Sequence, residues 1–132
     1  MQFKQYTICD NNKKIKPDEV KSLLDGSYWA PDRPLDVIMR TMQHSICIGA
    51  FDGTKLVGFA RVVTDRAVFA WIADIVVHPD HRGVGLATCM LRFIQEHPDI
   101  PSRLQVLRTR DAHSLYEKFG FRSDGSFMFK KN

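Results

Sequence analysis

Two short, mostly apolar stretches, separated by polar residues, occupy the middle of this 132-residue chain. The stretches 45–51 and 55–64 both have the pattern of strands. They flank Asp52-Gly53, a pair that favours a tight hairpin because glycine adopts positive φ at little cost. A third strand is predicted immediately afterwards, over residues 68–77. Together these neighbouring strands predict an antiparallel meander.

Helical and extended patterns alternate in the rest of the chain. Helices are predicted over residues 17–26, 34–43, 84–97 and 111–120, and further strands over residues 3–9, 103–109 and 126–130. A meander followed by helical crossovers predicts an α/β or α+β fold, in which helices cover a mixed sheet. The chain shows no repeat or linker, and with 44% hydrophobic residues it is long enough for one compact domain over residues 1–132.

The net charge and the cysteine content exclude few classes of protein. The net charge of +4 favours an anionic partner, but the basic residues are spread along the chain, whereas a nucleic-acid binder needs them clustered among aromatic residues. Cys9, Cys47 and Cys89 are odd in number and lack CxxC spacing, which fits a reducing compartment. No apolar run approaches the length of a membrane span. We expect a soluble, cytoplasmic protein without a membrane partner.

The stretch "HPDHRGVG", residues 78–85, joins a predicted strand to a predicted helix. A helix that begins within such a loop presents several free main-chain N–H groups in one direction, which suits a phosphate group. Gly83 and Gly85 remove side chains where a pyrophosphate approaches the main chain, Ala87 keeps the helix start slim, and Arg82 adds positive charge. An ordinary glycine-containing turn before a packed helix is the alternative.

Two motifs in the second half of the chain carry a family resemblance. "RGVGLA", residues 82–87, matches the Arg/Gln-x-x-Gly-x-Gly/Ala motif of the GNAT acetyltransferase superfamily, and "DAHSLYEKFGF", residues 111–121, is similar to a downstream segment of that family. The resemblance implies a mostly antiparallel central sheet with a splayed pair of strands that admits acetyl-coenzyme A. It also implies direct transfer of the acetyl group to a primary amine in a ternary complex.

The resemblance assigns roles residue by residue. Main-chain groups at the loop and helix start would hold the pyrophosphate, namely those of Gly83, Val84, Gly85 and Ala87, with Thr88. Val76 and Val77 would supply main-chain partners for the pantetheine, and Ala112 and Ser114 would lie near the sulfur. Tyr116 corresponds to the family's usual general acid, which protonates the departing thiolate. The alternative for Tyr116 is a half-buried aromatic ring that anchors its helix.

The general base is not assigned by the resemblance alone. Ala73 stands where some members of the family have a glutamate, and Asp74 follows it. An ionised carboxylate among apolar neighbours is costly unless it is paired or functional, so Asp74 is a candidate catalytic residue. A structural ion pair, with Arg61 as the candidate partner, is the alternative. A third possibility is a general base that removes the amine proton through a water molecule.

Acceptor binding is expected from the loop "SYWAPDRP". Tyr28 and Trp29 would supply an apolar wall and Arg33 a guanidinium, which together suit a small amine bearing a carboxylate or phosphate. Alternatively, Trp29 covers the core and Arg33 faces solvent. His78 and His81 lack a third ligand, so no metal site is expected. The identity of the amine stays open, as does homodimer formation, and a non-catalytic acyl-coenzyme A sensor is the alternative to an enzyme.

Overall fold

A six-stranded sheet organises residues 1–131, the part of the chain that this computed structural model describes. The strands lie in the order of the sequence: β1 (Gln2–Phe3), β2 (Tyr6–Cys9), β3 (Ile46–Asp52), β4 (Lys55–Thr64), β5 (Ala70–Val77) and β6 (Gln105–Val106). Neighbouring strands are antiparallel from β1 to β5, and β6 pairs with β5 in parallel. The predicted mixed, mostly antiparallel sheet is confirmed.

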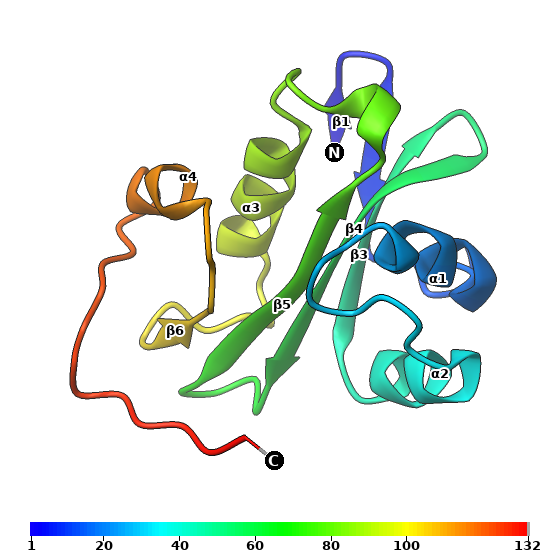
Figure 1. Cartoon of the computed structure of the whole chain (residues 1–132). Coiled ribbons are helices and arrows are strands. Elements are labelled where there is room, and N and C mark those ends of the chain that lie inside the picture. Colours follow the sequence, from blue (N-terminus) through cyan, green and yellow to red (C-terminus); the bar gives the residue numbers. More distant parts are fainter. Residues whose placement is uncertain (132) are drawn as a thin grey trace.

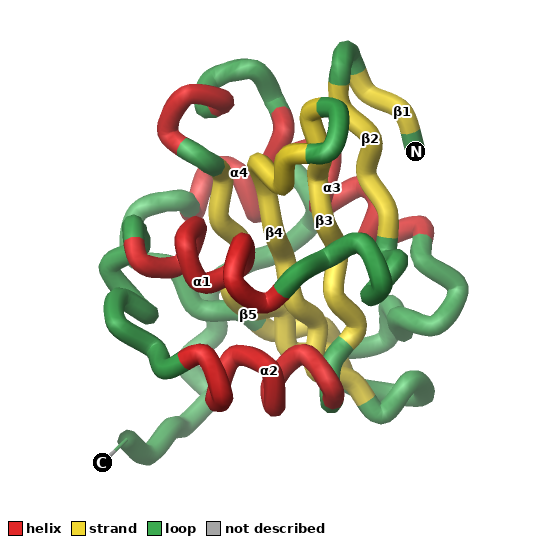
Figure 2. The backbone as a smooth tube through the Cα atoms, turned by 90° about the vertical axis from the view of Figure 1, so that its right-hand side faces the viewer, coloured by secondary structure: helices red, strands yellow, loops and turns green. Residues whose placement is uncertain are grey.

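Helices cover both faces of this sheet. They are α1 (Pro17–Asp25), α2 (Leu35–Gln43), α3 (Leu86–Glu96) and α4 (His113–Glu117), with a short 3₁₀ helix, η1 (Pro79–His81), before α3. Figures 1 and 2 show α1 and α2 on one face and α3 on the other, and in Figure 1 α4 lies to the left of α3, above β6. At 11 residues α3 is the longest of them, and within residues 1–131 no helix has the length and apolar character needed to cross a bilayer.

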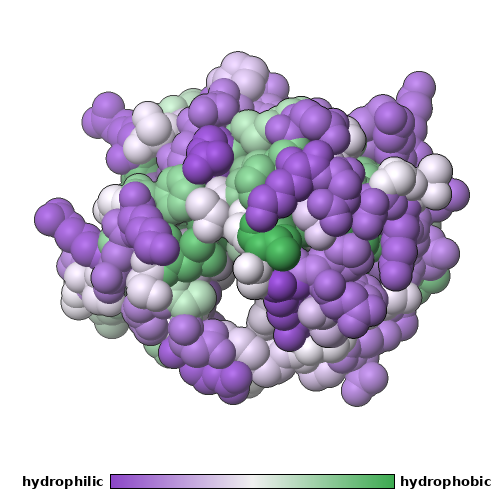
Figure 3. Space-filling view, turned by 90° about the horizontal axis from the view of Figure 1, so that it is seen from above, coloured by the Kyte–Doolittle hydropathy of each residue, from purple (hydrophilic) through white to green (hydrophobic). Residues whose placement is uncertain are grey.

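Each face of the sheet has its own apolar core. Met90, Leu91 and Ile94 of α3 are fully buried against one face, and side chains of α1 and α2 such as Leu24 and Ile38 are buried against the other. Burial of one such side chain stabilises the fold by about 1.5–3 kcal/mol. In the view from above, the surface is mostly hydrophilic, with hydrophobic side chains gathered near its middle (Figure 3).

Two predicted strands differ from the structure. The strand predicted over residues 3–9 is a hairpin, because Lys4 takes a left-handed conformation (φ 51°) and lets β1 fold back onto β2. The strand predicted over residues 126–130 is absent from the sheet: this segment runs outside the body of the molecule, and Phe127, Met128 and Phe129 are exposed (Figure 1). Strand β6 lies at the edge of the sheet and has only two residues instead of the seven predicted. It therefore offers few main-chain N–H and carbonyl groups with which a further strand could pair.

Strand β5 contains a bulge at Asp74, in its middle. Phe59 of β4 is opposite Val76, whereas Arg61 is opposite Ala73, so β5 carries one extra residue between them. Asp74 lies in this bulge with φ 56°, a left-handed conformation that is uncommon outside glycine. The extra residue redirects the side chain of Asp74, which is 8% exposed.

Candidate active site

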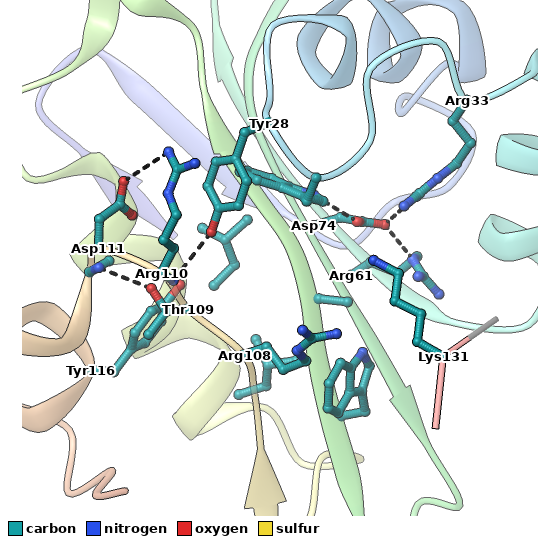
Figure 4. A pocket seen from close by; sticks show the side chains of 16 residues that line it. Tyr28, Arg33, Arg61, Asp74, Arg108, Thr109, Arg110, Asp111, Tyr116 and Lys131 are labelled. Atoms are coloured by element: carbon teal, nitrogen blue, oxygen red, sulfur yellow. Dashed lines mark hydrogen bonds and ion pairs between the residues drawn. The ribbon is translucent and has the colours of Figure 1, made fainter. Parts of the chain in front are cut away.

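Strands β5 and β6 separate soon after they meet. Their register contains two pairs, Ala70 with Gln105 and Trp71 with Val106, and the chain after β6 then diverges from β5. A cavity of about 730 Å³ lies along the diverging segments and reaches the loop between α1 and α2 (Figure 4). It is lined by Tyr28, Trp29, Arg33, Arg61, Trp71, Ile72, Ala73, Asp74, Ile75, Arg108, Thr109, Arg110, Asp111, Ala112, Tyr116 and Lys131.

Asp74 ties the α1–α2 loop to the sheet. One carboxylate oxygen accepts hydrogen bonds from Nη1 of Arg33 and Nε of Arg61, both at 2.8 Å, and the other accepts one from Nε1 of Trp29 at 3.1 Å. Arg61 also donates to Oγ of Ser45. Burial alone would raise the pKa of Asp74, but the hydrogen bonds and charges of the two arginines together hold it below its ordinary value. Asp74 is therefore ionised at neutral pH.

Tyr28 and Arg110 form a bridge across the cavity. The guanidinium carbon of Arg110 lies 3.7 Å from the centre of the Tyr28 ring, and the Arg110 main-chain N–H donates to the Tyr28 hydroxyl at 3.3 Å. Arg110 is also 3.7 Å from the carboxylate of Asp111. These contacts join the α1–α2 loop to the segment between β6 and α4, two parts of the chain that lie on opposite sides of the cavity (Figure 4).

The Tyr116 ring enters the cavity from α4. Its ring is half-buried and meets Phe121 edge to face at 6.1 Å between centroids. Burial raises the pKa of the Tyr116 phenol above its ordinary value of 10.0, and Tyr28 and Asp111 raise it further. The phenol therefore stays protonated at neutral pH and is available as a hydrogen-bond donor.

The loop before α3 has the geometry of an anion site. Gly83 and Gly85 take φ of 78° and 91°, and Gly85 is the N-cap of α3. The N–H groups from Gly83 to Thr88 have no hydrogen-bond acceptor among residues 1–131, and the first turn of α3 contains no acidic residue. Since α3 has 11 residues, its aligned peptide dipoles add a partial positive charge at this end.

The sequence and the fold both match known acetyltransferases. The acetyltransferase (GNAT) domain family matches residues 43–123. The chain is 33% identical to an uncharacterized N-acetyltransferase, ycf52, of Porphyra purpurea, with 86% of this chain and 69% of that protein covered. A crystal structure of a protein belonging to the GNAT family from Xanthomonas campestris pv. campestris has a TM-score of 0.90 at 33% identity, covering 96% of this chain and 93% of that one.

This chain belongs to the GNAT acetyltransferase family. The predicted GNAT resemblance, the fold class and the N-acetyltransferase class of enzyme are thereby confirmed. A further relative, the mycothiol acetyltransferase of Saccharomonospora viridis, is 33% identical over 78% of this chain but only 37% of its own length.

Within this GNAT fold, most of the predicted site residues fall into two groups. The cavity contains six of them: Tyr28, Trp29, Arg33, Asp74, Ala112 and Tyr116. The loop and the first turn of α3 contain another six: Arg82, Gly83, Val84, Gly85, Ala87 and Thr88. Ser114 lies on α4 but is exposed and does not line the cavity. The predicted ion pair between Asp74 and Arg61 is present.

Val76 and Val77 differ in where their main-chain groups point. The N–H of His78 donates to the carbonyl of Val57, and hydrogen bonds alternate along an antiparallel pair. Val76 therefore pairs with β4, whereas Val77 presents its N–H and carbonyl to the open edge of β5. Nε of Arg82 donates to this Val77 carbonyl at 3.0 Å, so the Arg82 side chain fastens the loop to the end of β5.

Several cavity residues were not predicted from the sequence. Arg61 was considered only as a partner of Asp74, and Trp71, Arg108, Arg110 and Lys131 were not considered. Alternation along the first half of β5, before the bulge, places Trp71 and Ala73 on one side and was the available signal for Trp71. Among the described residues, no group of three or more His, Cys, Asp or Glu side chains is arranged to hold a metal ion.

Replacement of Asp74 by asparagine should lower the free energy of unfolding at pH 7 by about 2–4 kcal/mol, because two largely buried guanidiniums lose their counter-charge. Asparagine tolerates the left-handed backbone of this position. Since the pKa of Asp74 is depressed, the stability it contributes is present at neutral pH and is lost as the pH falls through its folded-state pKa. Denaturant unfolding of both proteins from pH 7 into the acid range measures the difference, which should shrink at low pH.

Asp99→Asn is the matched control for Asp74→Asn. Asp99 pairs with Arg66 at 3.1 Å, but both side chains are 57% exposed, so the loss should stay below about 1 kcal/mol. Equal stability of the Asp74→Asn and Asp99→Asn variants would show that the buried cluster does not hold the loop.

Proposed function

We propose that residues 1–132 form a single GNAT domain that transfers the acetyl group of acetyl-coenzyme A to a primary amine by direct attack in a ternary complex. The observation that carries this proposal is the position of two features along β5. The anion-binding loop follows the end of the strand, and the cavity with Tyr116 opens beside its middle. A cosubstrate with phosphates at one end and a thioester at the other suits that separation.

The loop residues would bind the phosphate end. The pyrophosphate would accept hydrogen bonds from the N–H groups of Gly83, Val84, Gly85 and Ala87, with Thr88 at the start of α3. The main-chain groups of Val77 on the open edge of β5 would pair with the pantetheine. Val76 is a weaker candidate for that role because its own groups point towards β4.

Tyr116 would act as the general acid. As the amine nitrogen forms its bond to the acetyl carbon and the carbon–sulfur bond breaks, the sulfur leaves with the electron pair of that bond. The phenol would donate a proton to this thiolate. A tyrosine whose pKa is raised above 10.0 remains protonated until it is needed, which supports this assignment. Ala112, at the start of α4, would lie beside the thioester.

Asp74 would orient the acceptor site and not serve as the base. Its depressed pKa makes the carboxylate a weak proton acceptor, and its oxygens already accept three hydrogen bonds. Through these bonds it fixes Trp29 and Arg33, two residues predicted to contact the amine. The ammonium would lose one proton to water before attack, and the nitrogen would lose a second to water as the amide forms. Tyr116 would then be reprotonated from solvent.

A thiol-release screen tests the proposed function. Purified protein and acetyl-coenzyme A are incubated with amino acids, amino sugars, small polyamines and peptides with a free N-terminus, and free thiol is followed with time. We expect turnover with at least one of these classes of amine, with the acetylated product identified by mass spectrometry. Tight coenzyme binding without turnover in any class would favour an acyl-coenzyme A sensor, and absence of coenzyme binding would contradict both.

A further inference from the structure

The cavity has an excess of positive charge among the side chains that line it. Five cationic side chains line the cavity, Arg33, Arg61, Arg108, Arg110 and Lys131, against two carboxylates, those of Asp74 and Asp111. Residues of the phosphate-binding loop are not among those that line it, so these cations lie apart from the groups proposed to hold the pyrophosphate. An excess of one charge in a cavity attracts ligands of the opposite charge.

Three of the five cations already have partners within the protein. Arg33 and Arg61 both bind Asp74 at 2.8 Å. Arg110 stacks on Tyr28 at 3.7 Å and lies 3.7 Å from Asp111. Arg33, which the sequence suggested for an anionic group of the acceptor, therefore has its charge partly neutralised. The remaining candidates are Arg108 and Lys131.

Arg108 and Lys131 have no carboxylate within 4.0 Å among residues 1–131. The guanidinium of Arg108 lies over the Phe129 ring, 4.8 Å from its centre, so an aromatic face supports it and its N–H groups stay open to a ligand. Figure 4 shows Arg108 extending from the segment after β6 and Lys131 from the C-terminal segment, both towards the part of the cavity that contains Asp74.

From this arrangement we infer that the acceptor amine carries a carboxylate or phosphate group, and that Arg108, assisted by Lys131, binds it. The inference rests on the proposed function for the amine itself, but the anion site can be measured without any acetyl transfer. A planar guanidinium matches two oxygens of either anion, while Lys131 contributes a point charge. The ammonium end of such an acceptor would then lie between this pair and Tyr116.

Tryptophan fluorescence gives a direct reading of this site. The chain contains two tryptophans, Trp29 and Trp71, and both line the cavity. With the protein saturated with coenzyme A, so that the phosphate-binding loop is occupied, inorganic phosphate is titrated at constant ionic strength. We expect a saturable change in fluorescence whose apparent Kd rises by about 10- to 100-fold in Arg108→Ala, as for loss of a charge-assisted hydrogen bond, and less in Arg108→Lys.

Arg40→Ala is the matched control, since Arg40 is exposed on α2 and does not line the cavity. It should bind phosphate as the wild type does. Calorimetry of acetyl-coenzyme A with Arg108→Ala should show unchanged affinity. Weakened coenzyme binding in this variant would mean that Arg108 serves the coenzyme, and an unchanged phosphate titration would mean that Arg108 binds no anion there. Either result overturns the inference.

Matched amines test the same inference in turnover. Glucosamine 6-phosphate is compared with glucosamine, O-phosphoethanolamine with ethanolamine, and L-methionine with its amide. The anionic member of the pair that is acetylated should have the higher kcat/KM, by about tenfold or more, and Arg108→Ala should remove that preference. Preference for the neutral member refutes the inference but leaves the acetyltransferase proposal intact. Saturable phosphate binding without acetylation of any amine refutes the proposed function and leaves the anion site.

Discussion

Replacement of Gly85 by glutamate is expected to weaken acetyl-coenzyme A binding by at least about 100-fold while the protein stays folded. A carboxylate at the N-cap of α3 would occupy the space proposed for the pyrophosphate. A like charge about 4 Å from a phosphate costs several kcal/mol at the effective dielectric of a protein surface. The Cβ atom itself would lie 3.4 Å from Cζ of Phe3, which is an ordinary contact. Calorimetric titration with acetyl-coenzyme A measures the loss.

Gly53→Glu is the matched control for Gly85→Glu. Gly53 also has a left-handed backbone, with φ of 62° against 91° at Gly85, and a Cβ atom there meets nothing within 4 Å. It lies in the hairpin between β3 and β4, so the variant carries the same added charge and similar backbone strain away from the loop. Comparable thermal unfolding of the two variants would attribute lost binding to the loop. Unchanged coenzyme affinity in folded Gly85→Glu would reject the pyrophosphate assignment.

The fold was predictable where the information is local. Prediction of the hairpin between β3 and β4 needed only two short apolar stretches around Asp52-Gly53, and the start of α1 followed from Pro17. The strand predicted over residues 3–9 is extended except at the turn at Lys4, whereas the strand predicted over residues 126–130 was wrong because strand structure depends on a partner. Residues 126–130 contain an apolar run that is typical of a strand, yet β6 is too short to pair with them. Such a run shows which residues are able to form a strand and not whether the edge of a sheet is available to pair with it.

The candidate site was likewise predictable only where its residues are close together in the sequence. The loop proposed to bind the pyrophosphate is a continuous stretch, so its glycines and the start of α3 could be predicted from residues 82–87. The cavity is assembled from β5, the α1–α2 loop, the segment after β6 and the C-terminal segment, which are far apart in sequence. The pair of Asp74 with Arg61 was predicted from neighbouring strands, but no pattern along the chain reveals that Arg33 also binds Asp74 while Arg108 has no carboxylate partner among residues 1–131. Which cationic side chains have a carboxylate partner depends on contacts between segments that are far apart in the sequence.

Replacement of Tyr116 by phenylalanine should lower kcat by on the order of 100-fold, as for loss of one positioned proton donor, with little change in coenzyme affinity. The hydroxyl has no hydrogen-bond partner among the described residues, so its removal should barely alter stability. Residual activity should survive, because a coenzyme A thiolate leaves fairly well and water can protonate it. Steady-state kinetics with whichever amine the screen identifies measures the change, which should lie in kcat more than in the acceptor KM.

Phe121→Leu separates loss of the acid from loss of packing. Phe121 contacts the Tyr116 ring edge to face, so this variant loosens the ring and keeps the phenol. A fall in kcat as large as that of Tyr116→Phe would mean that Tyr116 matters through packing. The pH dependence is a second readout: a general acid loses activity as the pH rises through its pKa, here above 10.0. The wild type should therefore lose activity in that alkaline range, and Tyr116→Phe, already without the proton donor, should lack this limb of the profile.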